Sequence, residues 1–384
     1  MGNANIRKCE KILLLDGESR KTLVALHSLA RRKYEIIVAS PYLLPICRFS
    51  NFCYRFYRCP RTDDPSFAKW LISLIKEIHI DAVLGSSDKT VEKLVSMKDE
   101  FETGIIIPFP DATLWKNAND KYWISVIAKQ SGIPTPKTAL VRGEDEIPDA
   151  LSITGLPAVM KPRFGWGKRG VFLITDAREA KKCYESSRKI SEVIIQEFIP
   201  WGGAYGYCAI FGFNSCPYVS FSFERVREYP PDGGPSTYRI AKKVPKVIEY
   251  GERLLRAIRW YGIAMVEFRR SSQDNEFYLM EINPRFWGSM ALAIGAGIDF
   301  PSLLLDLFLG RLSPMPVRWR EKTAFRWFLG EIKRLFAMKF NPKEVLKMVN
   351  TIDAKDDIFN IRDPFPFLAN LLFTPIKLFR GSSI

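Results

Sequence analysis

The sequence predicts a parallel α/β unit, then an α+β region, and finally a basic extension rich in aromatic residues. Three observations lead to this fold class. The first third of the chain alternates short apolar runs with helical periodicity, strands and hairpins replace that alternation from about residue 140, and basic and aromatic residues dominate past Arg311. With 384 residues, 47% apolar and 26% charged, the chain can form two or three domains with a large core.

The strands expected in the first third are near-continuous apolar runs separated by helices. This pattern is typical of a parallel sheet covered on both faces, so we expect a Rossmann-like unit. No GxGxxG motif follows the first strand, so the sequence does not assign this unit a dinucleotide. The expected strands are Lys11–Asp16, Glu35–Ser40, Asp81–Gly85 and Gly104–Phe109, and the expected helices are Ser19–Arg32, Pro65–Ile78 and Thr90–Lys98.

A helix with clear start and stop signals follows. Asn119 or Asp120 can cap it, and Gly132 with Pro134 ends it. Beyond about Leu140, short strands indicate an α+β region, with helices at Asp176–Ser187 and Pro245–Tyr261. The expected strands are Pro157–Lys161, Val171–Thr175, Val193–Phe198, Tyr207–Gly212, Tyr218–Phe223, Ile263–Arg270 and Glu276–Asn283.

Two carboxylates in this region are predicted to face each other. Strand alternation places Glu281 and Asn283 on one face, and a turn near Asp274 would set Glu267 opposite Glu281. Opposed carboxylates repel, and a cation relieves the repulsion. Carboxylate and amide oxygens together with phosphate suit Mg²⁺. The alternative is a surface hairpin with its acids in water, and apolar neighbours on the same faces favour the metal site.

Pro157–Gly170 (PAVMKPRFGWGKRG) is a second candidate site. A strand ends in Lys161, and a loop with Gly165, Gly167 and Gly170 follows. Backbone N–H groups of such a loop can surround phosphate oxygens, and the lysine adds a mobile charge. A glycine-rich hairpin with surface lysines is the ordinary alternative, so this segment gains weight only with the motifs around it.

The chain resembles the ATP-grasp superfamily, which includes biotin carboxylase and the large chain of carbamoyl-phosphate synthetase. The resemblance runs from about Lys116 to Arg311, and the α/β unit ahead of it resembles that family's pre-grasp domain. Four motifs in the family's order carry it: Asn119-Asp120-Lys121 before Ser131–Thr138 (SGIPTPKT), Lys161 with its glycine loop, Gln196-Glu197-Phe198-Ile199, and Glu267 with Glu281-Ile282-Asn283-Pro284-Arg285.

The resemblance implies a domain organisation. Residues 1–115 would form the pre-grasp domain, residues 116–312 the ATP-grasp fold, and residues 313–384 a helical extension. The ATP-grasp fold would consist of an N-terminal lobe over about 116–195 and a C-terminal lobe over about 196–312.

The resemblance also implies roles for single residues. Lys121 and Lys161 would hold the phosphates of ATP, and Arg285 would stabilise charge on the transferring phosphoryl group or on an acyl phosphate. Gln196, Glu197, Phe198 and Ile199 would form the hinge that binds adenine. Glu267, Glu281 and Asn283 would hold two Mg²⁺ ions, for which Mn²⁺ can substitute. The family often has an acid about seven residues past the hinge glutamate for ribose, and Gly202–Gly206 has none.

Arg225 and Arg227 lie two residues apart and therefore on one face of a strand. Gly233–Thr237 can form an anion-binding turn, and Arg239 follows it. Guanidinium groups pair with oxyanions through two parallel hydrogen bonds, so we expect an acyl-phosphate and carboxylate pocket here. The alternative is a solvent-exposed hairpin.

The function implied is an ADP-forming carboxylate–amine ligase, in which Mg-ATP activates a carboxylate as an acyl phosphate for attack by an amine. Electrostatics and positioning are most of what phosphoryl transfer requires. The alternatives are a bicarbonate-activating carboxylase, a nucleotide-regulated binding protein and a nucleic-acid binder. The sequence names neither substrate.

The basic residues are concentrated at both ends of the chain. The net charge is +15, and residues 1–62 hold 12 Lys/Arg against 4 Asp/Glu while residues 318–384 hold 13 against 7. The aromatic-basic cluster Arg48–Arg61 is expected as a loop packed on the α/β unit rather than as a nucleic-acid site. With no secretory signal or transmembrane run, we expect a cytoplasmic protein. The apolar tail Pro364–Arg380 either packs as core or inserts shallowly at an anionic inner-membrane leaflet, with any helix limited by prolines to about Phe367–Thr374.

Overall fold

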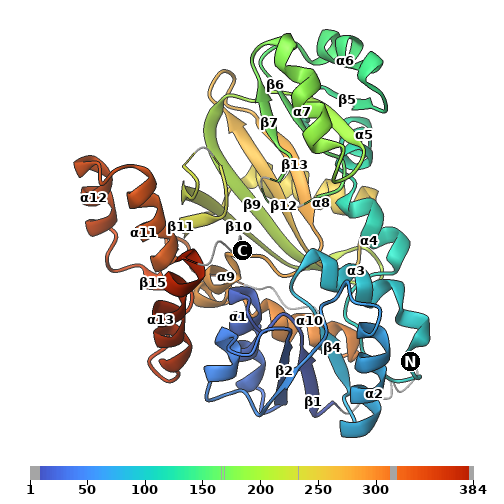
Figure 1. Cartoon of the computed structure of the whole chain (residues 1–384), viewed down its shortest axis with the longest axis vertical. Helices are drawn as coiled ribbons and strands as arrows, with labels where there is room; N and C mark the ends of the chain where they lie inside the picture. Colours follow the sequence, from blue (N-terminus) through green and yellow to red (C-terminus); the bar gives the residue numbers. More distant parts are fainter. Residues whose placement is uncertain (1–8, 166, 168, 232, 312–317, 380–384) are drawn as a thin grey trace. The chain divides into compact units, whose positions relative to one another are not determined.

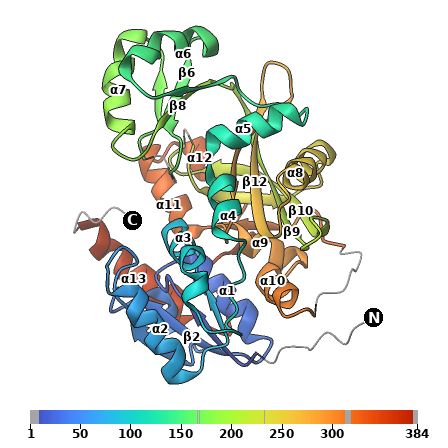
Figure 2. The same cartoon turned by 90° about the vertical axis from the view of Figure 1, so that its right-hand side faces the viewer.

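A computed structural model describes residues 9–165, 167, 169–231, 233–311 and 318–379. The chain folds into two compact units, and each unit is built from separate stretches of sequence (Figures 1 and 2). Unit 1 contains Met1–Asp111, Arg227–Ala241 and Arg285–Ile384. Unit 2 contains Ala112–Val226 and Lys242–Pro284. The chain therefore passes from one unit to the other within the region that resembles ATP-grasp enzymes.

The first part of unit 1 is the expected parallel α/β sheet, with strand order β3-β2-β1-β4. Strands β1, β2 and β4 are almost wholly buried, because helices flank them in sequence and supply apolar faces, whereas the edge strand β3 is only partly covered. The strands are β1 (Lys11–Leu14), β2 (Glu35–Ser40), β3 (Arg55–Arg58) and β4 (Ala82–Leu84), and the helices are α1 (Arg20–Ala30), α2 (Phe67–Ile78) and α3 (Asp88–Ser96).

Two expectations for this sheet are wrong. Gly104–Phe109 is not a strand, because only Ile106 pairs with the sheet, in a single bridge to Ala82. Pro108 lacks the N–H that a longer ladder needs. Arg48–Arg61 is not simply a loop, since it contains the edge strand β3 and part of the short 3-10 helix η1 (Ile46–Phe49).

The rest of unit 1 is largely helical. β11 pairs antiparallel with β14, which pairs parallel with β15. No single helix in the described part of the chain is long and apolar enough to cross a membrane; α9 and α10 reach that threshold only as a pair bent by 91°. The elements are β11 (Ser236–Ala241), α9 (Met290–Ala296), α10 (Phe300–Phe308), β14 (Ala324–Arg326), α11 (Phe328–Ala337), α12 (Pro342–Val349), β15 (Lys355–Asp356) and α13 (Phe365–Phe379).

Helix α13 is longer than the sequence predicts, since it runs from Phe365 through Pro375. Pro366 lies in the first turn, where a missing backbone N–H is unpaired in any helix and proline is tolerated. Pro375 continues the helix, so the expected stop at Thr374 is wrong.

The N-terminal part of unit 2 is a four-stranded antiparallel sheet in the order β5-β8-β6-β7. Its core is made of alternate strand residues such as Met160 and Ile195, which helices α6 and α7 cover. The elements are β5 (Thr138–Val141), α6 (Ile147–Thr154), β6 (Ala158–Pro162), β7 (Phe172–Ile174), α7 (Ala180–Ser187) and β8 (Val193–Glu197).

The second sheet of unit 2 has the strand order β13-β12-β9-β10 and carries the larger core. Helix α8 lies close against β9, because Gly251 has no side chain; a Cβ there would lie 2.2 Å from the ring of Tyr207. The elements are α4 (Ala112–Asn119), α5 (Lys121–Gln130), β9 (Trp201–Phe211), β10 (Pro217–Glu228), α8 (Pro245–Ala257), β12 (Gly262–Ser271) and β13 (Phe277–Asn283).

A buried ion pair fastens the extension within unit 1. Arg227 NH2 lies 2.5 Å from Glu331 Oε2, and the two side chains are 7% and 2% exposed. Arg227 NH2 also donates to Thr351 Oγ1 at 2.7 Å. One guanidinium therefore links the end of β10 to α11 and to the residues that follow α12.

We predict that Arg227→Met lowers the free energy of unfolding by about 3–5 kcal/mol, because Glu331 is left buried without its cation. The double variant Arg227→Met/Glu331→Leu should recover most of the loss. Urea denaturation measures both. The control is Arg178→Met, whose side chain is 90% exposed and whose loss should leave the free energy of unfolding almost unchanged. Equal losses of unfolding free energy in Arg227→Met and Arg178→Met would contradict a stabilising role for the buried Arg227–Glu331 pair.

Candidate functional site

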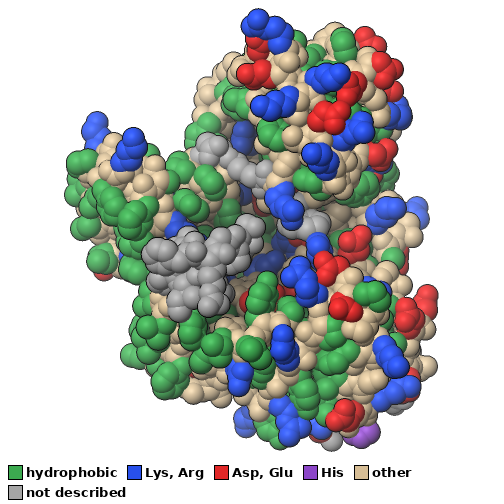
Figure 3. Space-filling view, in the orientation of Figure 1, with side chains coloured by type: hydrophobic (Ala, Val, Ile, Leu, Met, Phe, Trp, Pro, Cys, Tyr) green, Lys and Arg blue, Asp and Glu red, His purple; other side chains and the backbone are tan. Residues whose placement is uncertain are grey.

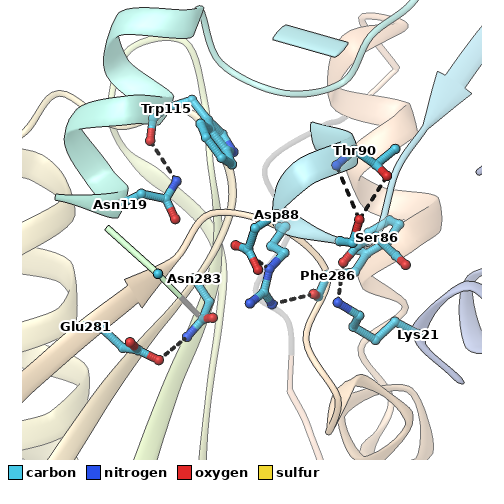
Figure 4. Close-up of polar contacts among 12 residues, drawn as sticks. Lys21, Ser86, Asp88, Thr90, Trp115, Asn119, Glu281, Asn283 and Phe286 are labelled. Carbon is cyan, nitrogen blue, oxygen red and sulfur yellow. Dashed lines mark hydrogen bonds and ion pairs between the residues drawn. The ribbon is translucent and has the colours of Figure 1, made fainter. Parts of the chain in front are cut away.

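The three residues predicted as metal ligands meet on the β12–β13 hairpin of unit 2. Glu267 pairs directly with Glu281 in the strand register, as the alternation predicted. Asn283 lies two residues further on the same face of β13, and its Nδ2 is 3.1 Å from Glu267 Oε1 and 3.4 Å from Glu281 Oε1 (Figure 4 shows the contact with Glu281). The hairpin therefore presents two carboxylates and one amide at a single spot.

Each carboxylate has a cationic partner from another element. Arg225 on β10 places NH1 2.5 Å from Glu267 Oε2, and Lys121 at the start of α5 places Nζ 3.7 Å from Glu281 Oε2. Opposed carboxylates on neighbouring strands repel each other. The two cations offset this repulsion, so Arg225 and Lys121 join the predicted ligands in one cluster.

Lys161 on β6 belongs to the same electrostatic cluster. The pKa of its ammonium group is lowered to about 8, chiefly by burial and next by the positive charge of Lys121, while the carboxylates of Glu281 and Glu267 act in the opposite direction. The two lysines that the sequence paired are therefore close enough to repel each other. An anion that binds between them would relieve that repulsion.

The start of α5 is fixed to the loop after β6. Asp120 caps the helix by accepting hydrogen bonds from the backbone of Tyr122 and Trp123, and Arg163 NH2 lies 2.5 Å from its carboxylate. Lys121 Nζ donates to the carbonyl of Gly165 at 2.7 Å. These contacts position the ammonium group of Lys121 beside Glu281.

Glycines allow the loop its backbone path. Gly167 and Gly170 have φ of +65° and +69°, in the left-handed region that favours glycine. A Cβ on Gly170 would also lie 2.8 Å from Ile190 Cδ1. Two loop members of the predicted motif, Trp166 and Lys168, lie outside the described residues.

The predicted hinge segment begins at the end of β8. Gln196 Nε2 donates to Thr138 Oγ1 at 2.8 Å, and the Glu197 carboxylate accepts from the backbone of Lys137 at 3.2 Å. Phe198 N donates to Pro157 O at 3.2 Å, and Ile199 O accepts from Arg269 at 3.3 Å.

Arg269, which the sequence did not single out, connects the hinge to the cluster. Besides its hydrogen bond to Ile199, its charge is among those that lower the pKa of Lys161. Its strand position two residues after Glu267 is the signal that was available, since alternation places both on one face of β12.

Of the three predicted catalytic arginines, Arg225 alone lies in this cluster. Arg227 is bound to Glu331 in unit 1. Arg285 also belongs to unit 1, where its Nε lies 2.7 Å from Asp88 Oδ1 and its NH1 donates to Phe286 O (Figure 4).

Unit 1 holds a second polar cluster, which the sequence analysis missed. Lys21 Nζ donates to the carbonyl of Ser86 (Figure 4), and burial, followed by the charge of Arg285, lowers the pKa of its ammonium group to about 7. The carboxylate of Asp16 accepts from Ser86 N at 2.7 Å and from Thr90 Oγ1 at 2.6 Å. These residues follow the carboxyl ends of β1 and β4, where the strand order of the sheet reverses direction and where open α/β sheets bind ligands.

The donor set in unit 2 fits a hard divalent cation. Two carboxylates and an amide that can present its oxygen are the ligand types that Mg²⁺ prefers. Among the described residues no group of three or more His, Cys, Asp or Glu side chains is placed to hold a metal, so a cation here would rely on the amide and on a bound anion to complete its ligands.

Two family models match parts of the chain that contain these residues. A model of the RimK-like ATP-grasp domain matches residues 118–208, and a model described as ATP-grasp in the biosynthetic pathway with Ter operon matches residues 223–330. Between them these matches include every predicted site residue that lies in the unit 2 cluster. The chain belongs to the ATP-grasp superfamily.

Individual relatives are distant. The D-alanine–D-alanine ligase of Coprothermobacter proteolyticus is 25% identical over 63% of this chain and 84% of that protein. The N5-carboxyaminoimidazole synthetase of Staphylococcus aureus has the same fold, with a TM-score of 0.69 at 18% identity over 89% of this chain and 88% of that one. Acetyl-CoA carboxylase 1 of Oryza sativa is 21% identical over 56% of this chain, which spans only 11% of that protein. The C-terminal section of the carbamoyl phosphate synthase large chain of Methanopyrus kandleri is 22% identical over 56% of this chain, which spans 41% of that protein.

We predict that Lys161→Met raises the melting temperature of the unliganded protein at pH 7. The folded-state pKa of Lys161 is about 8 and its ordinary value is 10.5, so the unfolded chain binds the proton more tightly and the buried charge opposes folding below pH 8. Wild-type stability should rise relative to the variant between pH 8 and 10.5, so the difference in melting temperature between the two proteins should shrink over that range.

Thermal unfolding at pH 7 and pH 10 measures the effect. The control is Lys129→Met, an exposed lysine on the same helix as Lys121. A lower melting temperature for Lys161→Met at pH 7, or a difference that grows with pH, would contradict the electrostatic account.

Proposed function

We propose that the protein is a ligase that uses Mg-ATP to activate a carboxylate as an acyl phosphate and joins it to an amine, releasing ADP and phosphate. The observation that supports this most is the unit 2 cluster, in which Glu267, Glu281 and Asn283 meet the two lysines on an ATP-grasp fold. The substrates would be small molecules, one with a carboxylate and one with an amine.

In this proposal Lys121 and Lys161 bind the phosphates of ATP. Glu267, Glu281 and Asn283 would hold two Mg²⁺ ions, which supply charge neutralisation for the phosphoryl group in transfer. Adenine would bind along the hinge at Gln196–Ile199. Each lysine is a mobile point charge on a long side chain, so Lys121 can leave Glu281 for a phosphate when a metal ion takes its place.

The chemistry then proceeds in two displacements. A carboxylate oxygen of the first substrate attacks the γ-phosphorus, and the bond to the ADP oxygen breaks. The amine of the second substrate attacks the acyl carbon, phosphate leaves, and the amine loses a proton to solvent. Positioning and electrostatics supply the rate enhancement, so the reaction needs no covalent intermediate with the protein.

We infer that Arg225 acts on the first displacement. It belongs to the cluster, and its guanidinium donates a hydrogen bond to the carboxylate of Glu267. An incoming carboxylate beside Glu267 would meet the same guanidinium, which forms parallel hydrogen bonds with oxyanions.

A bicarbonate-activating enzyme is the second candidate, because a biotin carboxylase domain of Hydrogenobacter thermophilus, solved with MgADP and bicarbonate, has the same fold with a TM-score of 0.68 over 83% of this chain. Bicarbonate would enter the same first displacement in place of the organic carboxylate. A substrate screen that includes bicarbonate separates the two.

We predict that ADP release requires one carboxylate and one amine from a matrix of such compounds, read by coupled ADP assay and product mass. Glu281→Gln should lower turnover by at least about 100-fold with the fold intact, since it removes a charge needed only when Mg-ATP is bound. The control is Glu249→Gln, an exposed residue on α8. Turnover of Glu281→Gln close to wild type would rule out the proposed site.

A further inference from the structure

In the C-terminal part of unit 1, most acidic side chains are buried and most basic side chains are exposed. Glu331, Glu344 and Asp357 are buried in ion pairs with arginines, and Asp363 is buried against His27. In the fully described stretch 328–373, the single acid that is exposed is Asp353. The exposed cations in the same stretch are Lys339, Lys343, Lys347, Lys355 and Arg362. The surface of this stretch is therefore cationic, although its acidic and basic residues are nearly equal in number.

Large apolar side chains lie exposed among these cations. On the hairpin of α11 and α12, Phe336 is 65% exposed, Phe340 50%, Leu346 59% and Val349 54%. The rings of Phe336 and Phe340 contact each other edge to face, with centroids 4.8 Å apart. Figure 3 shows hydrophobic side chains gathered over α11 and α12, with Lys or Arg side chains at their edge. Lys339, Lys343 and Lys347 alternate with these apolar residues along the sequence.

Helix α13 adds a second exposed apolar stripe. Phe365, Leu368 and Leu372 are 53%, 49% and 68% exposed and lie at helical positions i, i+3 and i+7. The other face of the helix is packed, with Pro366 and Ala369 buried and the rings of Phe373 and Phe49 5.7 Å apart. The helix thus packs on η1 with one face, as the core expectation requires, and leaves apolar side chains exposed beside that face. Arg380 lies outside the described residues.

We propose that this surface, formed by the exposed apolar and basic side chains of residues 336–372, docks on an anionic lipid bilayer. Its apolar side chains would enter the headgroup boundary, and its lysines would contact anionic headgroups. Clusters of exposed apolar side chains among charged ones mark interaction sites. An apolar helix face bordered by lysines is the composition of helices that lie in the membrane interface.

The charge pattern favours lipid over the other occupants. A second copy of the chain would bring two cationic surfaces together. A nucleic acid would use the cations and would find Phe336 and Phe340 for stacking, but it would leave aliphatic side chains such as Leu346 without a partner. An anionic bilayer uses both the charges and the apolar side chains.

The test is flotation of the full chain with phosphatidylcholine vesicles, with and without phosphatidylglycerol, at low and high salt. We expect binding that requires phosphatidylglycerol and weakens with salt. Lys339→Gln/Lys343→Gln should reduce partitioning about five-fold for each charge lost. Phe336→Ser/Phe340→Ser should reduce it as well, while the control Ile153→Ser/Leu156→Ser, at two exposed apolar residues of unit 2, should not.

Wild type that stays unbound on both vesicle types, or binds them equally, overturns the proposal. Loss of a dimer in Phe336→Ser/Phe340→Ser, measured by sedimentation velocity, would show instead that a second copy covers the surface. Binding that depends on the lysines alone and that RNA displaces would identify a polyanion site. If the phenylalanine variant fails to fold, Leu346→Ser/Val349→Ser on α12 makes the same comparison.

Discussion

Two carboxylates stand opposite each other on adjacent strands of unit 2, and the rest of the candidate site depends on how their repulsion is met. Glu267 and Glu281 are held in register by the β12–β13 ladder, and Arg225 and Lys121 bring a cation to each. Arg225 arrives on β10, and Lys121 arrives on a helix fixed by its capping residue, Asp120. Because side chains alternate along a strand, a slip of one residue in the β12–β13 register would turn Glu267 or Glu281 to the opposite face of the sheet.

The same balance explains the state of the neighbouring lysine. Lys161 is buried beside Lys121, and its lowered pKa shows that the two carboxylates do not fully compensate for burial and the second ammonium group. Under the proposed function, ATP phosphates would supply the missing negative charge and Mg²⁺ would supply positive charge to the carboxylates. When Mg-ATP binds, the lysines and carboxylates of the cluster would exchange their present partners for phosphate and metal, and no buried charge would be left unpaired.

Local patterns predicted much of this arrangement. Alternation together with a turn near Asp274 set Glu267 opposite Glu281, and the sequence around Asp120 was enough to place the start of α5. Long-range partners were out of reach. Alternation puts Arg225 and Arg227 on one face, yet their partners, Glu267 and Glu331, are 42 and 104 residues away in sequence and belong to different units. Nothing local distinguishes an arginine that joins a site from one that fastens a helix.

The errors in the predicted elements have the same origin. Gly104–Phe109 has the composition of a strand, but a strand exists only where a neighbour pairs with it, and only Ile106 finds one. The sorting of charges in residues 328–373 was also invisible in sequence, since acids and bases are interleaved there and only the fold shows which are buried.

The central claim is that Glu281 helps to bind a divalent cation together with ATP. Titration of Mn²⁺ in the presence of ATP, followed by the loss of the free-ion EPR signal, tests it without knowledge of the substrates. The account predicts that wild type and Glu249→Gln bind Mn·ATP alike and that Glu281→Gln binds it at least about ten-fold more weakly. Superimposable titrations for wild type and Glu281→Gln would contradict it.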